Sequence, residues 1–139
     1  MTTSIIFNPA RVLAFINSFY RLPVSSEMKG IGLEKDGELI AGVIYEGTNQ
    51  HNTWMHVAAV PGAKWMTREY LRNCFDYPFN QLKVDRVSGY VDASNAQARR
   101  LNEHLGFTTE AVLRGAAPDG GDVILYVMWR KDCRYVDPL

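Results

Sequence analysis

The fold of this chain is constrained most by the order in which strand-like and helix-like segments alternate. Apolar residues recur at every second position in some segments and at intervals of three or four in others, which indicates strands and helices respectively. The predicted strands cover residues 4–7, 29–33, 39–46, 52–60, 86–91, 107–113 and 123–129. The predicted helices cover residues 8–20, 67–82 and 95–105. The order β-α-β-β-β-α-β-α-β-β predicts a β-rich mixed sheet with helices on its faces.

Turn and cap residues support several boundaries of these segments. Asn8 and Pro9 are predicted as the cap and first residue of the first helix, because Asn accepts from open amides there and Pro has no N–H to leave unpaired. Asp36-Gly37, between the second and third strands, is a strong hairpin signal. Pro78 lies inside the second predicted helix, so we expect that helix to kink or to end early.

Length, charge and hydropathy limit the class of protein. The chain has 139 residues without a repeat, low-complexity run or linker, which predicts a single domain over residues 1–139. Lys and Arg total 15, as do Asp and Glu, so the chain lacks the basic surplus that duplex nucleic-acid binders need. There is no secretion signal, and no apolar segment approaches the roughly 20 residues of a membrane span. We therefore predict a cytoplasmic protein without a membrane or nucleic-acid partner.

The cysteines and histidines form no metal-binding pattern. Cys74 and Cys133 are not part of a C-x-x-C pair. The histidines, which lack the spacing of metal ligands, are His51, His56 and His104. The sequence therefore predicts no metal site, and a disulfide between the two cysteines stays open.

The segment "VDASNAQARRLNEHLGF", residues 91–107, contains a strand end, a short polar helix and a glycine stop. One interpretation is ordinary capping, with Ser94 or Asn95 at the start of the helix and Gly106 in a positive-φ conformation after its end. A second interpretation is that Asn95 also lies beside a ligand, because open helix amides face outward at this position. The two interpretations are compatible.

Residues 79–132 resemble the second half of the GNAT N-acetyltransferase superfamily. The matching positions, in chain order, are Asn95, Ala98, Leu101, Leu105-Gly106-Phe107, Glu110, Leu113-Arg114, Asp122, Tyr126 and Met128. A coarser resemblance covers nearly the whole chain, with Gly42 where the third strand of the family usually has a glycine. The resemblance implies an α/β (α+β) fold with a mixed, mostly antiparallel central sheet, a splayed strand pair and helices on both faces.

The resemblance also implies acetyl-CoA as a co-substrate, with its pantetheine arm in the gap between the splayed strands near Asn95. The diphosphate-binding loop of the family aligns with "GAKWMT", residues 62–67. In this loop Gly62 replaces a basic or amide residue, and Trp65 replaces a glycine. The implied cofactor-binding residues are Val57, Ala58, Gly62, Ala63, Lys64, Trp65, Met66, Thr67, Arg68, Asn95 and Asn102.

Trp65 is the main departure from the family pattern. A glycine lets the backbone approach a phosphate closely, so an indole at this position should obstruct the diphosphate unless the loop has been rebuilt. The other interpretation is that Trp65 is a core or interface aromatic residue. Lys64 and Arg68 remain nearby as positive charges, and Thr67 is a candidate helix cap.

His56 is the first candidate for a general base, because it is the titratable residue of the predicted strand 52–60 and its ordinary pKa suits proton transfer near neutral pH. Glu46, at the end of the preceding strand, is the alternative base, and a structural role for His56 also stays open. The family's tyrosine that reprotonates the leaving thiolate aligns with Asn102. Tyr126 is predicted either to line the acceptor side or to pack in the core.

Two main hypotheses for function follow. The first is an acetyl-CoA-dependent N-acetyltransferase, an acyltransferase acting on an amine such as a protein N-terminus, a side chain or a small molecule. The second is a catalytically inactive GNAT-like binding or structural protein, in a viral or mobile-element assembly, which Gly62, Trp65 and Asn102 favour. A third is a GNAT-fold enzyme with a different transfer, such as nucleotide modification. The family habit also suggests a homodimer through the late strands.

Overall fold

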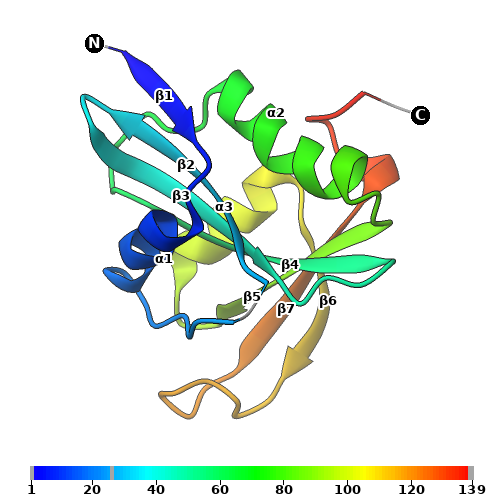
Figure 1. Cartoon of the computed structure of the whole chain (residues 1–139). Helices are drawn as coiled ribbons and strands as arrows, with labels where there is room; N and C mark the ends of the chain where they lie inside the picture. The colour runs from blue at the N-terminus through cyan, green and yellow to red at the C-terminus, as the bar shows by residue number, and fades with distance from the viewer. Residues whose placement is uncertain (1, 26, 138–139) are drawn as a thin grey trace.

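A computed structural model describes residues 2–25 and 27–137 as one mixed sheet with helices on both faces (Figure 1). The strands are β1 (Thr3–Ile6), β2 (Lys29–Lys35), β3 (Glu38–Glu46), β4 (Asn52–Ala59), β5 (Arg86–Asp92), β6 (Thr108–Leu113) and β7 (Val123–Trp129). The α-helices are α1 (Pro9–Asn17), α2 (Arg68–Asp76) and α3 (Ala96–Leu105). The strand order is β1-β2-β3-β4-β5-β7-β6, and all neighbours are antiparallel except β4 and β5. The predicted element order and fold class are confirmed.

The pairing of β4 with β5 is the irregular feature of this sheet. These parallel strands pair over three residues of each, with Asn52–Trp54 opposite Arg86–Ser88. Beyond Trp54 the two strands diverge, although β4 continues to Ala59 and stays paired with β3. The predicted splayed pair is therefore confirmed, and it opens the sheet between β4 and β5.

Helix α1 packs on one face of the sheet through a small apolar cluster. Asn8 caps it, with its side-chain oxygen accepting from the Arg11 amide at 3.1 Å, as predicted. Val12 and Ile16 are buried against the sheet together with Ile44 and Ala58. The helix is shorter than the predicted range 8–20 because its C-terminal residue, Asn17, turns the chain back. The Asn17 side-chain oxygen accepts from the Leu22 amide at 2.8 Å, which stabilises the turn after the helix.

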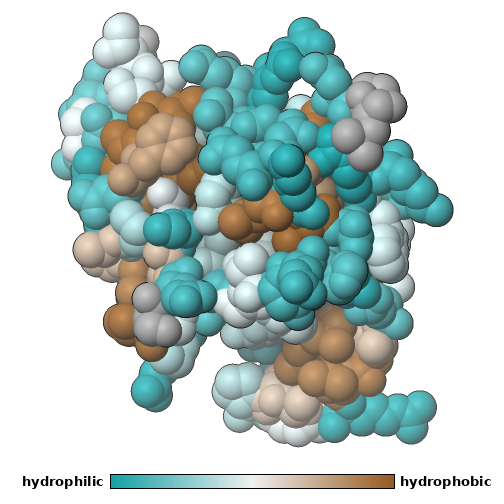
Figure 2. All heavy atoms as spheres, turned by 45° about the vertical axis from the view of Figure 1, so that its right-hand side comes forward, coloured by the Kyte–Doolittle hydropathy of each residue, from teal (hydrophilic) through white to brown (hydrophobic). Residues whose placement is uncertain are grey.

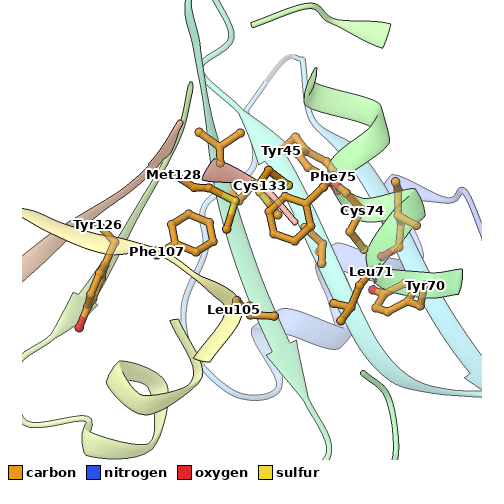
Figure 3. Close-up of a cluster of buried hydrophobic side chains, with 14 of the residues drawn as sticks. Tyr45, Tyr70, Leu71, Cys74, Phe75, Leu105, Phe107, Tyr126, Met128 and Cys133 are labelled. Carbon is orange, nitrogen blue, oxygen red and sulfur yellow. Dashed lines mark hydrogen bonds between the residues drawn. The ribbon is translucent and has the colours of Figure 1, made fainter. Parts of the chain in front are cut away.

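Helices α2 and α3 cover the opposite face and enclose the larger core (Figure 3). Phe75 of α2 stacks on Tyr135 and contacts Phe107, with ring centroids 4.9 and 6.2 Å apart. Cys74 and Cys133 are both free and buried in this core, so they do not form a disulfide. Burial raises the pKa of the Cys74 thiol to about 12, which keeps that thiol protonated.

The start and the end of α2 match the predictions from sequence. Thr67 accepts from the Tyr70 amide at 3.2 Å at the start of α2. The helix ends at Asp76, and the segment Tyr77–Gln81, which contains Pro78, continues as one wider π-helical turn. The expected early end at Pro78 is confirmed, because Pro has no N–H for an α-helical bond.

Helix α3 begins and ends with local signals. The Asn95 side-chain oxygen accepts from the Ala98 amide at 3.1 Å, so Asn95 rather than Ser94 is the cap. Gly106 has φ of 112°, and the amide of Phe107 returns to the Asn102 carbonyl at 2.9 Å. This is the left-handed glycine stop that the sequence predicted.

The surface drawn in Figure 2 is mostly polar, with separate apolar patches. The lowest patch lies over the β6–β7 hairpin, where Val112 and Leu113 are 49% and 45% exposed. The homodimer through these strands stays a prediction.

Within residues 2–25 and 27–137 no helix is long and apolar enough to cross a membrane. The same residues contain no cluster of three or more His, Cys, Asp or Glu side chains suited to a metal ion.

Gly42 is the glycine that the family resemblance singled out, and the structure gives a physical reason for it. A Cβ atom at Gly42 would lie 2.8 Å from Cγ1 of Val12 and 3.2 Å from a ring carbon of Phe15. Both residues belong to α1, and a β-branched side chain in a helix has little rotamer freedom. The missing side chain therefore allows α1 to lie close on β3.

We predict that Gly42→Ala lowers the free energy of unfolding by about 1–3 kcal/mol, the usual cost of overpacking. Urea unfolding monitored by circular dichroism measures this change. Gly89→Ala is the matched control in β5, because its Cβ would find its nearest neighbour at 3.7 Å, an ordinary contact. Equal stabilities of the two variants would contradict the close packing of α1.

Candidate active site

The divergence of β4 and β5 exposes backbone groups of β4 inside the sheet. The Val60 amide donates to the Ile40 carbonyl at 2.8 Å, so Ile40 and Val60 are a hydrogen-bonded residue pair at the end of the antiparallel β3–β4 ladder. Because such pairs alternate, His56 and Ala58 direct their backbone groups toward β3, and Val57 directs its own toward the gap. The Val57 carbonyl there accepts from the Tyr20 hydroxyl at 2.9 Å.

Three hollows adjoin one another along this gap. A small cavity of about 140 Å³, here called the gap cavity, lies between the diverging strands. A groove of about 490 Å³ lies between the end of β4, the loop before α2, and α3. A third hollow of about 470 Å³, here called the outer pocket, lies between the loop after α1 and the ends of β3 and β4.

Shared lining residues show that the three hollows adjoin one another. Val57 and Asn95 line both the groove and the gap cavity. His56 and Tyr90 line both the gap cavity and the outer pocket. His56 therefore lies where the gap between the strands meets the outer pocket.

His56 and Glu46 form a close pair at this junction. They are diagonal neighbours on β4 and β3, since Ile44 is opposite His56 and Glu46 is opposite Trp54. His56 Nε2 lies 2.6 Å from Glu46 Oε2, although the two are not aligned as a hydrogen bond. His56 is only 6% exposed, while the Glu46 side chain is 23% exposed.

Burial lowers the pKa of His56, and the neighbouring Glu46 carboxylate opposes this effect in part. With a pKa below the ordinary 6.5, the imidazole is neutral at pH 7 and can accept a proton. The carboxylate beside it would stabilise the imidazolium that then forms. This is the protonation state that a general base requires.

The loop between β4 and α2 contains Trp65, which was predicted either to obstruct the loop or to pack in the core. Trp65 is 7% exposed and lies in the core, where its ring meets Tyr70 edge to face at a centroid distance of 6.3 Å. Its indole therefore does not cover the outer side of the loop. Gly62 has φ of 81° and open space around it, so the backbone is accessible there. The structure places Trp65 as a core aromatic residue.

The other predicted cofactor residues fall into two sets. Those that line the groove or the gap cavity are Val57, Ala58, Gly62, Trp65, Met66, Asn95 and Asn102. Those that lie next to the groove, on the loop and first turn of α2, are Ala63, Lys64, Thr67 and Arg68. Lys64 and Arg68 are exposed, and Thr67 is occupied as the cap of α2.

Tyr126 packs in the core. Of its two predicted roles, the structure shows core packing, since Tyr126 is 1% exposed and lines none of the three hollows. Its hydroxyl donates to Oε2 of Glu103 on α3 at 3.1 Å, and Figure 3 shows it directed away from the Phe75 cluster. The reason is strand alternation, because Tyr126 shares the α3-covered face with Ile124 and Met128.

Four lining residues were missed by sequence reasoning. Tyr20 comes from the loop after α1, and no motif marked it. Tyr90 lies on β5 opposite Leu125, on the face away from α3. Arg100 and His104 line the groove from α3, and their spacing of four residues could have placed them on one helix face.

Comparison with known proteins gives structural matches only. No protein-family model and no curated protein sequence matches this chain. The spermidine N-acetyltransferase from Vibrio cholerae in complex with CoA and spermine has 17% identity and a TM-score of 0.74, covering 97% of this chain and 98% of that chain. The spermidine/spermine N-acetyltransferase SpeG from the same organism in complex with manganese ions has 17% identity and a TM-score of 0.71, covering 91% and 92%. This chain therefore has the fold of the GNAT N-acetyltransferases.

We predict that the free energy of unfolding falls as the pH drops below 6.5, and that His56 causes part of this fall. Between the ordinary pKa of 6.5 and the lower pKa in the folded state, the unfolded chain binds more protons, so acid favours unfolding by up to about 1.4 kcal/mol per pH unit. Urea unfolding at pH 7.5 and 5.5 measures this loss, which should be smaller in His56→Gln.

His104→Gln is the control for this experiment, because His104 is exposed on α3 and should leave the loss on acidification unchanged. An identical loss in the wild type and in His56→Gln would show that the folded state does not hold His56 neutral.

Proposed function

We propose that this chain is an acetyl-CoA-dependent N-acetyltransferase that acts on a primary amine. The observation that carries the proposal is the position of His56, a buried imidazole that lines both the gap cavity and the outer pocket. An acyl donor and an amine can therefore approach it by separate routes. The solved structures with the same fold include a spermidine N-acetyltransferase bound to CoA and spermine, which supports amine acetylation.

The groove and the loop before α2 suit acetyl-CoA. The pantetheine arm would lie in the groove and enter the gap cavity between Val57 and Asn95, which line both. The diphosphate would lie near Gly62 and the start of α2, where accessible backbone amides and the helix dipole favour an anion. Lys64 and Arg68 on one side, with Arg100 on α3, would add positive charge.

In the proposed reaction His56 takes a proton from the ammonium group of the acceptor, assisted by the Glu46 carboxylate. Acetyl-CoA supplies an activated acetyl group, whose C–S bond breaks as the new C–N bond forms, with the electron pair leaving on sulfur. The Val57 amide, directed into the gap, donates to the carbonyl oxygen as it gains negative charge. The sulfur gains a proton, and the nitrogen releases its second proton to solvent, which balances the reaction.

Two hydroxyls are available to protonate the sulfur, although Asn102 stands where many family members have a tyrosine. Tyr20 and Tyr90 both line the gap cavity. Burial raises the pKa of each above the ordinary value, so both hydroxyls keep their proton at neutral pH. The absent helix tyrosine therefore does not leave the cavity without a proton donor.

We predict that calorimetric titration of acetyl-CoA gives a micromolar Kd and that Arg100→Glu weakens it about tenfold or more, because a positive charge at the groove becomes negative. Lys131→Glu makes the same charge change at the other end of the sheet, in the turn after β7, and should leave the Kd unchanged.

The same titration separates the two functional hypotheses. The absence of heat and of a thermal shift at millimolar acetyl-CoA would refute the proposed enzyme and favour the binding or structural protein.

We predict that His56→Gln lowers kcat/KM by roughly 10²–10⁴, the usual contribution of a positioned general base, while the Kd of acetyl-CoA stays the same. The wild-type pH profile of kcat/KM should have an acidic limb below pH 6.5, because burial lowers the pKa of His56, and the variant should lack this limb. Steady-state kinetics from pH 5 to 8 measure both effects. A His56→Gln enzyme with the wild-type rate and profile would exclude His56 as the base.

A further inference from the structure

The outer pocket has an aromatic wall around a single carboxylate. Tyr90 meets Trp54 and His56 edge to face, at centroid distances of 6.1 and 5.4 Å. Tyr90 remains 48% exposed, so part of its ring is open to the pocket. The opposite side is formed by the loop after α1 and is mostly apolar: it consists of the buried Leu22, Pro23, the exposed Val24 and one polar residue, Ser25.

The charge of this pocket fits one ammonium group. Among the described residues that line it, Glu46 is the one carboxylate. Glu46 lies on the same side of the sheet as Trp54, to which it is directly opposite in register, and as Tyr90. An ammonium beside Glu46 would therefore also face aromatic rings, which attract cations through their electron-rich faces.

A polyamine fits the pocket less well. Each further ammonium of a polyamine would lie against Leu22 or Val24, where the described lining offers no second carboxylate. A charge placed on an apolar surface without a partner loses hydration that nothing replaces. An apolar body of the acceptor would instead be favourable there, because both partners leave water.

We infer that the acceptor is a primary monoamine with an apolar body. Its ammonium lies between Glu46 and the Trp54 and Tyr90 rings, and its body lies on Leu22 and Val24. This inference rests on the proposed acetyltransferase function and narrows it to an acceptor class different from that named for the spermidine N-acetyltransferases of the same fold.

The first test compares kcat/KM for 2-phenylethylamine, a short peptide with an N-terminal Phe, and spermidine. We expect 2-phenylethylamine or the peptide to exceed spermidine by tenfold or more, a difference of about 1.4 kcal/mol. The comparison of the first two compounds shows whether the amine is a small molecule or a peptide terminus. A higher kcat/KM for spermidine would overturn the inference.

A second test alters the charge of the pocket without disturbing the core. Val24 is 80% exposed, so Val24→Asp should fold normally and supply a second carboxylate. We expect the ratio of kcat/KM for spermidine to that for 2-phenylethylamine to rise about tenfold, as expected for one new charge pair. Val112→Asp, on the exposed strand β6 outside the pocket, is the matched control and should leave the ratio unchanged. An unchanged ratio in Val24→Asp would contradict the placement of the acceptor.

Direct binding separates failure of this inference from failure of the proposed function. Calorimetry without acetyl-CoA should show tighter binding of 2-phenylethylamine than of spermidine, and Glu46→Gln should weaken the binding of 2-phenylethylamine, whose ammonium loses its carboxylate partner. If no amine is acetylated and acetyl-CoA does not bind, the proposed function fails, and this titration still decides the ligand of the pocket. If acetylation occurs but spermidine binds and reacts better, the monoamine inference alone fails.

Discussion

The short parallel pairing of β4 with β5 is the constraint on which the proposed chemistry depends. Three residues of each strand pair, and the strands then diverge. A sheet normally satisfies its backbone groups by pairing with both neighbours, so the divergence leaves the Val57 amide and carbonyl facing a gap. The gap cavity, the groove and the outer pocket all adjoin this opening. Without the divergence, His56 would not line a cavity between the two strands.

The two faces of the sheet supply different parts of the site. On one face, α1 lies close to β3 because Gly42 has no side chain, and the loop that follows α1 forms one side of the outer pocket. On the other face, α2 and α3 form the large core and border the groove. Trp65 also belongs to this core, so its side chain contributes packing while the outer side of the loop at Gly62 stays open.

The fold could be predicted from sequence because its signals are local. Asn95 and Gly106 cap α3 with their own neighbours, and Asp36-Gly37 takes positive φ at both residues, as a tight hairpin turn requires. The site could be predicted only in part, because it depends on contacts between residues that are distant in sequence. Tyr20 reaches Val57, 37 residues away, and Tyr126 is directed to α3 by its register on β7. No short pattern encodes either contact, so Tyr20 was missed and the role of Tyr126 was left open between the acceptor side and the core.

The central claim is that the arm of acetyl-CoA enters the gap between β4 and β5. Backbone amide hydrogen exchange followed by NMR, with and without saturating desulfo-CoA, tests it at single residues. The account predicts slower exchange at Val57, whose amide faces the gap, and no change at Ala58, whose amide is directed toward β3. Unchanged exchange at Val57 with protection confined to residues 62–66 would contradict it, because the ligand would then lie on the loop without entering the sheet.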